Sequence, residues 1–205
     1  LTDDVMGGEG DFSRIVIPEG VVVKSLRGPE ETFIFGRIAT SPIADANGAS
    51  FSGTDSARCV YLNANSRIEG FTLTGGYATW KGDNSSQKNG GGVYAVNNTD
   101  CKVVNCIISN CYSVAVGSAG MNGCYLRCRI SDCLKPSVNY GHGLRNAKAY
   151  NCFFMSQQDS ITAGRDMYYC TFYMPKNKSD RQAHVCYGPF YGCVFLSSAN
   201  PGVQS

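Results

Sequence analysis

Charge is sparse in this chain: only 17% of its 205 residues are charged, and they form no basic run and no acidic tail. A nucleic-acid-binding protein usually gathers lysine and arginine on one face or in one segment, so this distribution argues against a nucleic-acid partner. Long apolar runs are also missing, and no stretch approaches the ~18 residues of a membrane span. The sequence therefore predicts neither nucleic-acid binding nor a membrane-spanning segment.

Helical 3.6-residue periodicity is absent as well, whereas a short strand-like motif recurs from residue 105 onward. Each copy contains one cysteine, and successive copies are 22, 24, 18 and 23 residues apart. These cysteines are Cys106, Cys128, Cys152, Cys170 and Cys193. A loose period in this range is typical of a stacked-repeat architecture.

The motif itself alternates as a half-buried strand does. The cysteine and the residue two later are apolar, while the residue between them varies and includes Arg129 and Thr171. Residues two before the cysteine are assigned the same inward parity, so Tyr150, Tyr168 and Tyr191 are predicted to stack as a ladder in or bordering the core. A second short strand per turn is predicted eight residues before the cysteine, at Gly120, Leu144, Thr162 and Val185.

These features predict an all-β fold, a single-stranded right-handed parallel β-helix with about 22 residues per coil and about seven to nine coils. Leucine-rich repeats would need a consensus that is absent, and propeller blades are longer. We expect one domain over 1–205, with coils over about 15–196 and loop insertions at 38–57, 75–92 and 174–183. Because no amphipathic cap precedes or follows the coils, the chain is expected to be a fragment, or a neighbouring domain or subunit covers its ends.

Eleven cysteines are many, and an odd number leaves at least one unpaired. A secreted disulfide framework is one interpretation. A second is an interior column, because coils stack about 4.8 Å apart and buried cysteine behaves as a small hydrophobic residue. Free, packed thiols are favoured for the five column cysteines, and Cys111 with Cys133 is the first pair to test for a bond.

Several segments together resemble a known family. They include 23–32, 58–62, 68–76, 90–94 and the Asn-Cys-x-Ile copies. Over about residues 15–196 they are similar to the pectin-lyase-like right-handed β-helix proteins, secreted or surface repeat proteins of bacteria. The resemblance implies an extracellular or cell-surface location. It leaves function open, because the superfamily spans polysaccharide lyases, hydrolases, adhesins and other surface proteins.

The resemblance also suggests catalytic groups to look for. Asn98-Thr99-Asp100 and Gly141-His142-Gly143 match two hydrolase motifs, but the adjacent acidic pair and the Arg-Ile-Lys of those enzymes are absent. A lyase would need a base and usually Ca²⁺, and Arg165 with Asp166 could flank a groove. No catalytic set is complete, so no cofactor is expected, with Ca²⁺ implied only for a lyase.

Other reactive residues give weaker signals. His142 and His184 lack a metal-ligand spacing, so no metal site is predicted, and Cys186 beside His184 is a weak nucleophile candidate. Exposed aromatic rings bind the apolar faces of sugars, so Trp80, Tyr77 and Tyr140 are the predicted ligand contacts.

The sequence thus favours a non-catalytic extracellular or cell-surface module that binds a polysaccharide or a surface protein. One alternative is a polysaccharide lyase or glycoside hydrolase acting on uronate-containing polysaccharide. Another is a structural spacer in a larger surface protein.

Overall fold

The chain is built from β-strands. The computed structural model describes residues 5–6, 12–40, 43–44, 50–52, 55–78, 88–96, 100–113, 115–133, 143–155, 160–163, 165–174, 184–185 and 189–197. These residues form strands and no helix, so none of them belongs to a helix that could cross a membrane.

Three large sheets contain almost all the strands. Sheet A consists of β1 (Val5–Met6), β2 (Phe12–Ile17), β7 (Arg58–Leu62), β10 (Val93–Ala95), β13 (Gly120–Met121), β16 (Leu144–Arg145), β19 (Ser160–Ala163) and β22 (His184–Val185). Sheet B consists of β3 (Val22–Lys24), β8 (Arg67–Glu69), β11 (Lys102–Val104), β14 (Cys124–Leu126), β17 (Lys148–Tyr150), β20 (Asp166–Tyr168) and β23 (Phe190–Tyr191). Sheet C consists of β4 (Phe33–Phe35), β9 (Thr72–Thr74), β12 (Ile107–Ser109), β15 (Arg129–Ser131), β18 (Phe153–Met155), β21 (Thr171–Met174) and β24 (Val194–Ser197).

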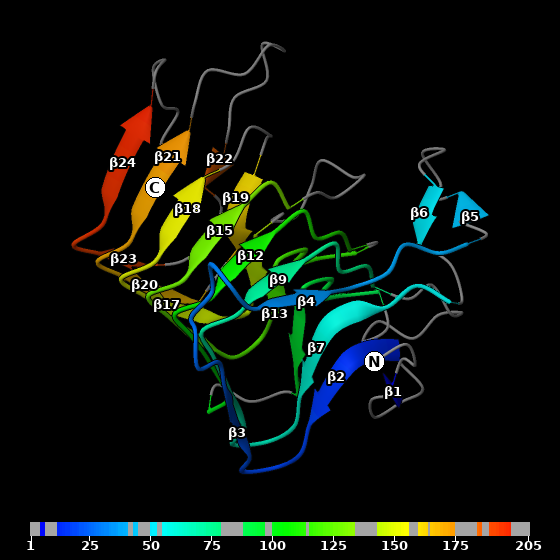
Figure 1. Ribbon diagram of the computed structural model, residues 1–205. Coiled ribbons are helices and arrows are strands. Elements are labelled where there is room, and N and C mark those ends of the chain that lie inside the picture. Colours follow the sequence, from blue (N-terminus) through cyan, green and yellow to red (C-terminus); the bar gives the residue numbers. More distant parts are fainter. Residues whose placement is uncertain are drawn as a thin grey trace.

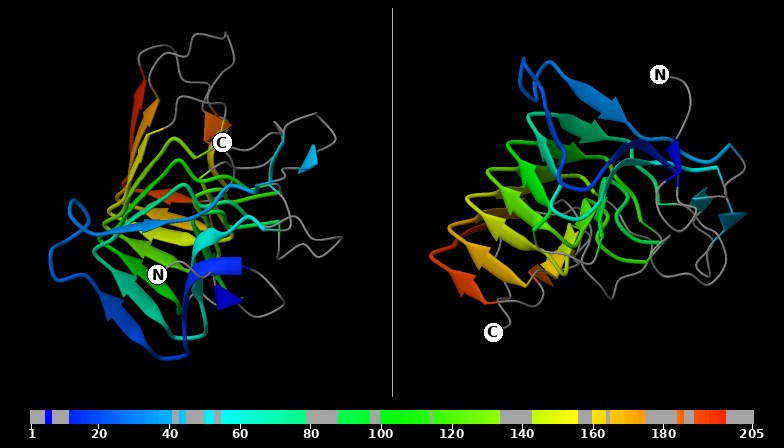
Figure 2. Two further views of the ribbon diagram at one scale, coloured as in Figure 1. Left: turned by 45° about the vertical axis from the view of Figure 1, so that its right-hand side comes forward. Right: turned by 90° about the horizontal axis from the view of Figure 1, so that it is seen from below.

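The chain visits the three sheets in strict rotation. From β2 on, each passage through sheets A, B and C makes one coil, and the described strands make seven coils. Within each sheet, neighbouring coils pair in parallel, except that β1 lies antiparallel to β2 at one edge of sheet A. Figures 1 and 2 show these coils stacked side by side from the N-terminal to the C-terminal end. The predicted all-β architecture with parallel sheets is confirmed, but each coil has three strands rather than the two predicted.

Apolar columns along the inside of the coils form the core. On sheet C the inward residue lies two positions after the column cysteine, as the alternation predicts. Three phenylalanines stack there, with ring centroids 4.8 Å apart for Phe154 and Phe172 and 5.0 Å apart for Phe172 and Phe195. Because equivalent positions of neighbouring coils meet, contacts between similar side chains recur along the axis.

A two-residue turn joins sheet B to sheet C in six of the seven coils. Its first residue is left-handed, with φ between 48° and 78°, and the six residues are Gly70, Asn105, Arg127, Asn151, Tyr169 and Gly192. In the last five coils its second residue is a column cysteine, whose thiol donates a hydrogen bond back to the carbonyl two residues earlier, as from Cys106 Sγ to Val104 O at 3.3 Å. The cysteine therefore closes the turn as well as filling the core.

This turn corrects one prediction. A left-handed residue redirects the chain, so the inward parity of sheet C does not continue backward into sheet B. The inward residues of sheet B lie three positions before the cysteine, as Tyr125 and Met167 do, although Val104, two positions before Cys106, is also buried. Tyr150, Tyr168 and Tyr191, two positions before it, face outward and are half-buried or exposed. The predicted stacking of these three rings is confirmed, but they lie on the outer side of sheet B and do not point into the core.

The predicted insertions are described only in part. The segment 38–57, predicted to be a loop, contains a short antiparallel pair, β5 (Ile43–Ala44) with β6 (Ser50–Ser52). Its base is closed by Arg37, whose guanidinium donates to Asp55 O at 2.6 Å and 2.8 Å. Of the other insertions, 75–78, 88–92 and residue 174 belong to the described part of the chain.

Candidate functional site

The outward-facing side of sheet B carries two columns of side chains, from the first and the third residue of each three-residue strand. At the C-terminal end of the third-residue column, Tyr150, Tyr168 and Tyr191 occupy paired positions on β17, β20 and β23. We call these three residues the tyrosine stack. Their neighbouring ring centroids are both 4.7 Å apart, and the ring planes differ by only 3° and 12°. The sheet register itself thus holds the three rings in a fixed row.

The geometry of the stack decides which atoms a ligand can reach. Each inner ring face is covered by the neighbouring ring, so the row presents mainly ring edges and phenolic hydroxyls to solvent. Exposure reaches 47% at Tyr191. Loss of water around the ring raises the pKa of Tyr168, and the Asp166 carboxylate raises it further. The Tyr168 hydroxyl therefore remains protonated at neutral pH and can both donate and accept a hydrogen bond.

An ion pair lies beside the tyrosine stack, in the first-residue column. Lys148 Nζ is 3.5 Å from Asp166 Oδ2, and the two side chains are 36% and 27% exposed. They occupy paired positions on β17 and β20, directly alongside Tyr150 and Tyr168. A surface pair of this kind adds little stability. It does place an ammonium and a carboxylate next to a row of hydroxyls.

A fourth tyrosine borders the stack in a strained conformation. Tyr169 is left-handed, with φ of 53°, although bulky residues rarely adopt this region. Its ring lies against Gly192 of the next coil, where an added Cβ would come within 2.7 Å of Tyr169 Cδ1. Its side chain is nevertheless 66% exposed. The repeating turn between sheets B and C imposes this conformation, and it leaves an exposed ring next to the tyrosine stack.

We expect Tyr169→Asn to raise the free energy of unfolding by about 1 kcal/mol, because asparagine tolerates the left-handed region better than tyrosine. The reverse exchange at the equivalent turn position, Asn151→Tyr, should lower it by a similar amount, since Asn151 has φ of 52°. Urea unfolding followed by circular dichroism measures both changes. A loss of stability in Tyr169→Asn would mean that packing on Gly192 outweighs the strain.

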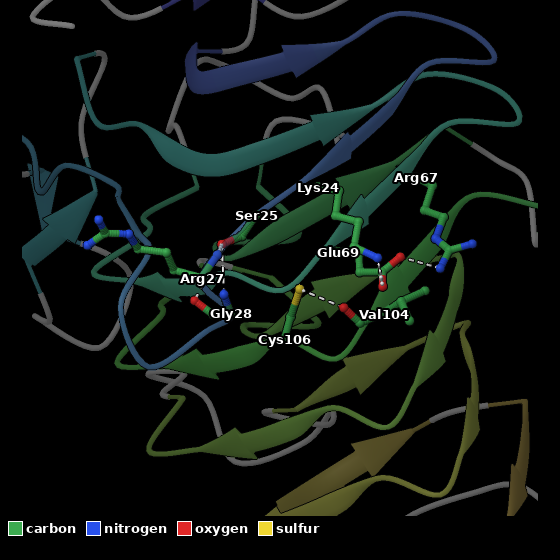
Figure 3. Close-up of polar contacts among 8 residues, drawn as sticks. All are labelled: Lys24, Ser25, Arg27, Gly28, Arg67, Glu69, Val104 and Cys106. Atoms are coloured by element: carbon green, nitrogen blue, oxygen red, sulfur yellow. Dashed lines mark hydrogen bonds and ion pairs between the residues drawn. The ribbon is translucent and has the colours of Figure 1, made fainter.

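The N-terminal end of the same face is charged instead of aromatic. Figure 3 shows Lys24, Arg67 and Glu69 converging there, with Lys24 Nζ 3.2 Å from Glu69 Oε1 and Arg67 hydrogen-bonded to the other carboxylate oxygen. Partial burial raises the pKa of Glu69, but the two cations outweigh burial and lower it overall. The face thus passes from a charged end to an aromatic end along the solenoid.

The hydrolase candidate Asp100 and the lyase candidates Arg165 and Asp166 lie in different coils. Asp100 is exposed in the third coil, whereas Arg165 and Asp166 belong to the sixth. Three coils at ~4.8 Å each separate them by about 14 Å along the axis. Asp166 faces Lys148, and the backbone N–H of Arg165 donates to Ala147 O at 2.8 Å. Asp100, the hydrolase candidate, and Arg165 with Asp166, the lyase candidates, therefore lie at separate places along the solenoid.

Of the three predicted ligand contacts, one is described. Tyr77 forms a parallel bridge with Tyr112, and the ring centroids are 5.7 Å apart. It is half-buried, and burial raises its pKa, so this ring anchors the base of the 75–92 insertion. Trp80 and Tyr140, like the candidates His142 and Cys186, lie outside the described residues.

The column cysteines are packed in the core of the solenoid. Four of the five column cysteines are at most 2% exposed, with Cys193 half-buried in the last coil. All ten described cysteines are free thiols, including Cys111 and Cys133, whose thiols donate to Ser109 O at 3.2 Å and to Ser131 O at 3.3 Å. Among the described residues, no three His, Cys, Asp or Glu side chains are grouped as a metal site requires.

Sequence reasoning missed the outward-facing tyrosines, although a signal was present. Glycine or asparagine precedes the column position at Gly70, Asn105, Asn151 and Gly192, and these residues favour left-handed turns. Such a turn would have placed the tyrosines on the surface.

No protein-family model, no curated protein and no solved structure matches this chain.

Proposed function

We propose that this protein is a non-catalytic module that binds a glycan on the outward-facing side of sheet B. The observation that carries the proposal is the tyrosine stack, a preformed row of three solvent-facing rings. Tyrosine contributes contact area at a low cost in conformational entropy, because it has few rotatable bonds. A rigid row of this kind needs little reorganisation when a ligand binds.

The neighbouring groups favour a sugar as the ligand. Sugar hydroxyls both donate and accept hydrogen bonds, and the phenolic hydroxyls can do the same. The ammonium of Lys148 and the carboxylate of Asp166 supply a further donor and acceptor within the same two coils. The exposed ring of Tyr169 offers apolar contact for the CH groups of a pyranose. A glycan chain lying along the solenoid axis would meet all of these groups in turn.

We further infer that the solenoid is a right-handed β-helix of the pectin-lyase-like class, acting outside the cell or at its surface. Crossover connections between parallel strands of one sheet are right-handed in almost all proteins, which supports this handedness. The strict rotation through three sheets and the short left-handed turn between two of them are compatible with that class.

A glycan array, followed by calorimetry on the best ligand, tests the function. Tyr168→Ala removes the central ring and should weaken binding at least about tenfold, which corresponds to ~1.4 kcal/mol. Tyr173→Ala is the matched control, because Tyr173 is a half-buried tyrosine of the same coil that faces outward from sheet C. It should leave the affinity unchanged.

Two outcomes would overturn the proposal. Equal losses in Tyr168→Ala and Tyr173→Ala, or no glycan bound at all, would remove the tyrosine stack as a sugar site. An ultraviolet absorbance assay for unsaturated uronates on pectin-type substrates tests the enzymatic alternative. A rise in absorbance would establish a lyase, and Arg165 and Asp166 would be the first residues to substitute.

A further inference from the structure

Exposed apolar side chains gather at the two ends of the solenoid. Every large hydrophobic side chain that is exposed among the described residues lies in or directly after the first coil or in the last two coils. At the N-terminal end these are Val21, Val22, Leu26, Phe33, Phe35 and Ile38, and at the C-terminal end Tyr169, Tyr191, Val194 and Leu196. The side walls between the ends show no such group within the described part of the chain.

The two edge strands of sheet C are apolar on both faces. In β4, Phe33 and Phe35 point outward and are 50% and 61% exposed, while Ile34 points inward. In β24, Val194 and Leu196 are the outward residues. Most interior strands of this sheet, namely β9, β12, β15 and β21, turn at least one hydroxyl or guanidinium outward, β18 being the exception. Strands that are apolar on both faces are typical of buried positions in a sheet.

The free backbone edges match as well. From the second coil on, the first residue of the sheet C strand donates its N–H to the carbonyl of the residue that precedes the sheet C strand one coil earlier, as Thr72 does to Thr32 O and Val194 to Cys170 O. No described strand lies beyond β4 or β24 in this sheet. The N–H of Phe33 at one end and the carbonyl of Cys193 at the other occupy the positions that this repeated bond would join.

We propose that copies of this chain stack head to tail, with β24 of one copy pairing in parallel with β4 of the next. The Phe33 N–H would donate to Cys193 O, which places Phe33, Ile34 and Phe35 beside Val194, Phe195 and Leu196 in the established register. On sheet B the same translation sets Lys24 of one copy beside Tyr191 of the other, a favourable cation–aromatic contact. On sheet A, β1 lies beside β2 in the layer that β22 of the neighbouring copy would take, so the stacked arrangement requires β1 to leave this edge.

Such a contact joins two different surfaces and does not close on itself. Each dimer leaves one free head and one free tail, so further copies can add without limit. The cavity of about 350 Å³ at the head, lined by Arg14, Ile15, Phe33, Ile34 and Phe35, would be covered by the last coil of the neighbouring copy. The assembly does not require a bound glycan, although its contact between Lys24 and Tyr191 reaches the C-terminal end of the tyrosine stack.

Sedimentation velocity over a wide concentration range tests the proposal. The wild-type chain should form an open series of oligomers. Phe35→Asp blocks the head and Leu196→Asp blocks the tail, and each variant alone should be monomeric. An equimolar mixture of the two should form dimers and nothing larger, because one intact head meets one intact tail. Phe153→Asp, an outward position on interior strand β18, should assemble as the wild type does.

Three results would overturn the proposal. They are a wild-type chain that stays monomeric at every concentration, a single blocked variant that still dimerises, and a mixture that stays monomeric. Far-UV circular dichroism and thermal melts verify folding of each variant. Where an aspartate variant melts early, Phe35→Ser or Leu196→Ser replaces it, and the apparent Kd for assembly should still rise at least about tenfold.

Discussion

The free energy of unfolding should fall steeply as the pH rises from about 9 to about 11, because the core contains neutral thiols. Burial raises the pKa of Cys106 from its ordinary value of 9.0 to about 11. The unfolded chain therefore loses this proton first, and deprotonation favours unfolding. The stabilisation is complete below pH 9 and is lost as the pH rises through about 11.

The expected change in the free energy of unfolding is large for one side chain. A shift of about two units corresponds to roughly 3 kcal/mol at high pH. Other column thiols act in the same direction: a hydrogen bond from its coil neighbour raises the pKa of Cys152, and burial adds to it. The same holds for Cys170, whose partner is Cys152. Several linked thiols should therefore make the fold sensitive to alkali.

Urea unfolding at a series of pH values, under reducing conditions, measures this dependence. Tyrosine and lysine also titrate in this range, so the comparison is with Cys106→Val, which keeps an apolar group at the position. The variant should lose less stability between pH 8 and pH 11 by roughly 2 kcal/mol. Parallel curves for the two proteins would show that Cys106 does not stay protonated in the fold.

The second large effect concerns backbone packing where sheet C returns to sheet A. Gly36, Gly76 and Gly91 lie against one another there, in successive passages of the chain. A Cβ at Gly76 would lie 2.2 Å from Gly91 O, 2.9 Å from Cys59 Sγ and 3.0 Å from Cys59 N. Two of these three atoms belong to the backbone, so rotation of a side chain cannot relieve the overlap. We expect Gly76→Ala to cost about 3 kcal/mol or more.

The adjacent residue provides a matched control. Gly75 has φ of 62° and open space where a Cβ would stand, so Gly75→Ala carries a conformational cost of about 1–2 kcal/mol without a collision. Thermal and urea unfolding of both variants separate the two causes. If Gly75→Ala proves as damaging as Gly76→Ala, close packing is not what requires glycine at position 76.

The repeating pattern predicted one wall of the solenoid well. Around each column cysteine, the alternation with Ile108, Phe154 or Phe172 identified the inward face of sheet C, because a short strand preserves its two-residue period. The pattern misassigned sheet B. One left-handed residue, such as Asn105 or Asn151, breaks the period between two strands that the sequence presents as one.

The candidate site could not be found in the same way. Tyr150, Tyr168 and Tyr191 recur with the spacing of core residues, and hydrophobicity alone does not distinguish an inner from an outer ladder of rings. The ion pair of Lys148 with Asp166 joins residues 18 apart and depends on the register of β17 with β20.

The stacking of coils also determines how the molecule would respond to tension. The hydrogen bonds between coils run along the solenoid axis, so a pull on the two ends acts on all the coils in series. The bonds of one coil would then break after those of another, starting from an end coil. A released coil of about 22 residues extends to roughly 75 Å at ~3.4 Å per residue. Under force the solenoid would therefore lengthen in discrete steps and dissipate energy at each step. The coils that have not yet been released would keep their tyrosine row intact.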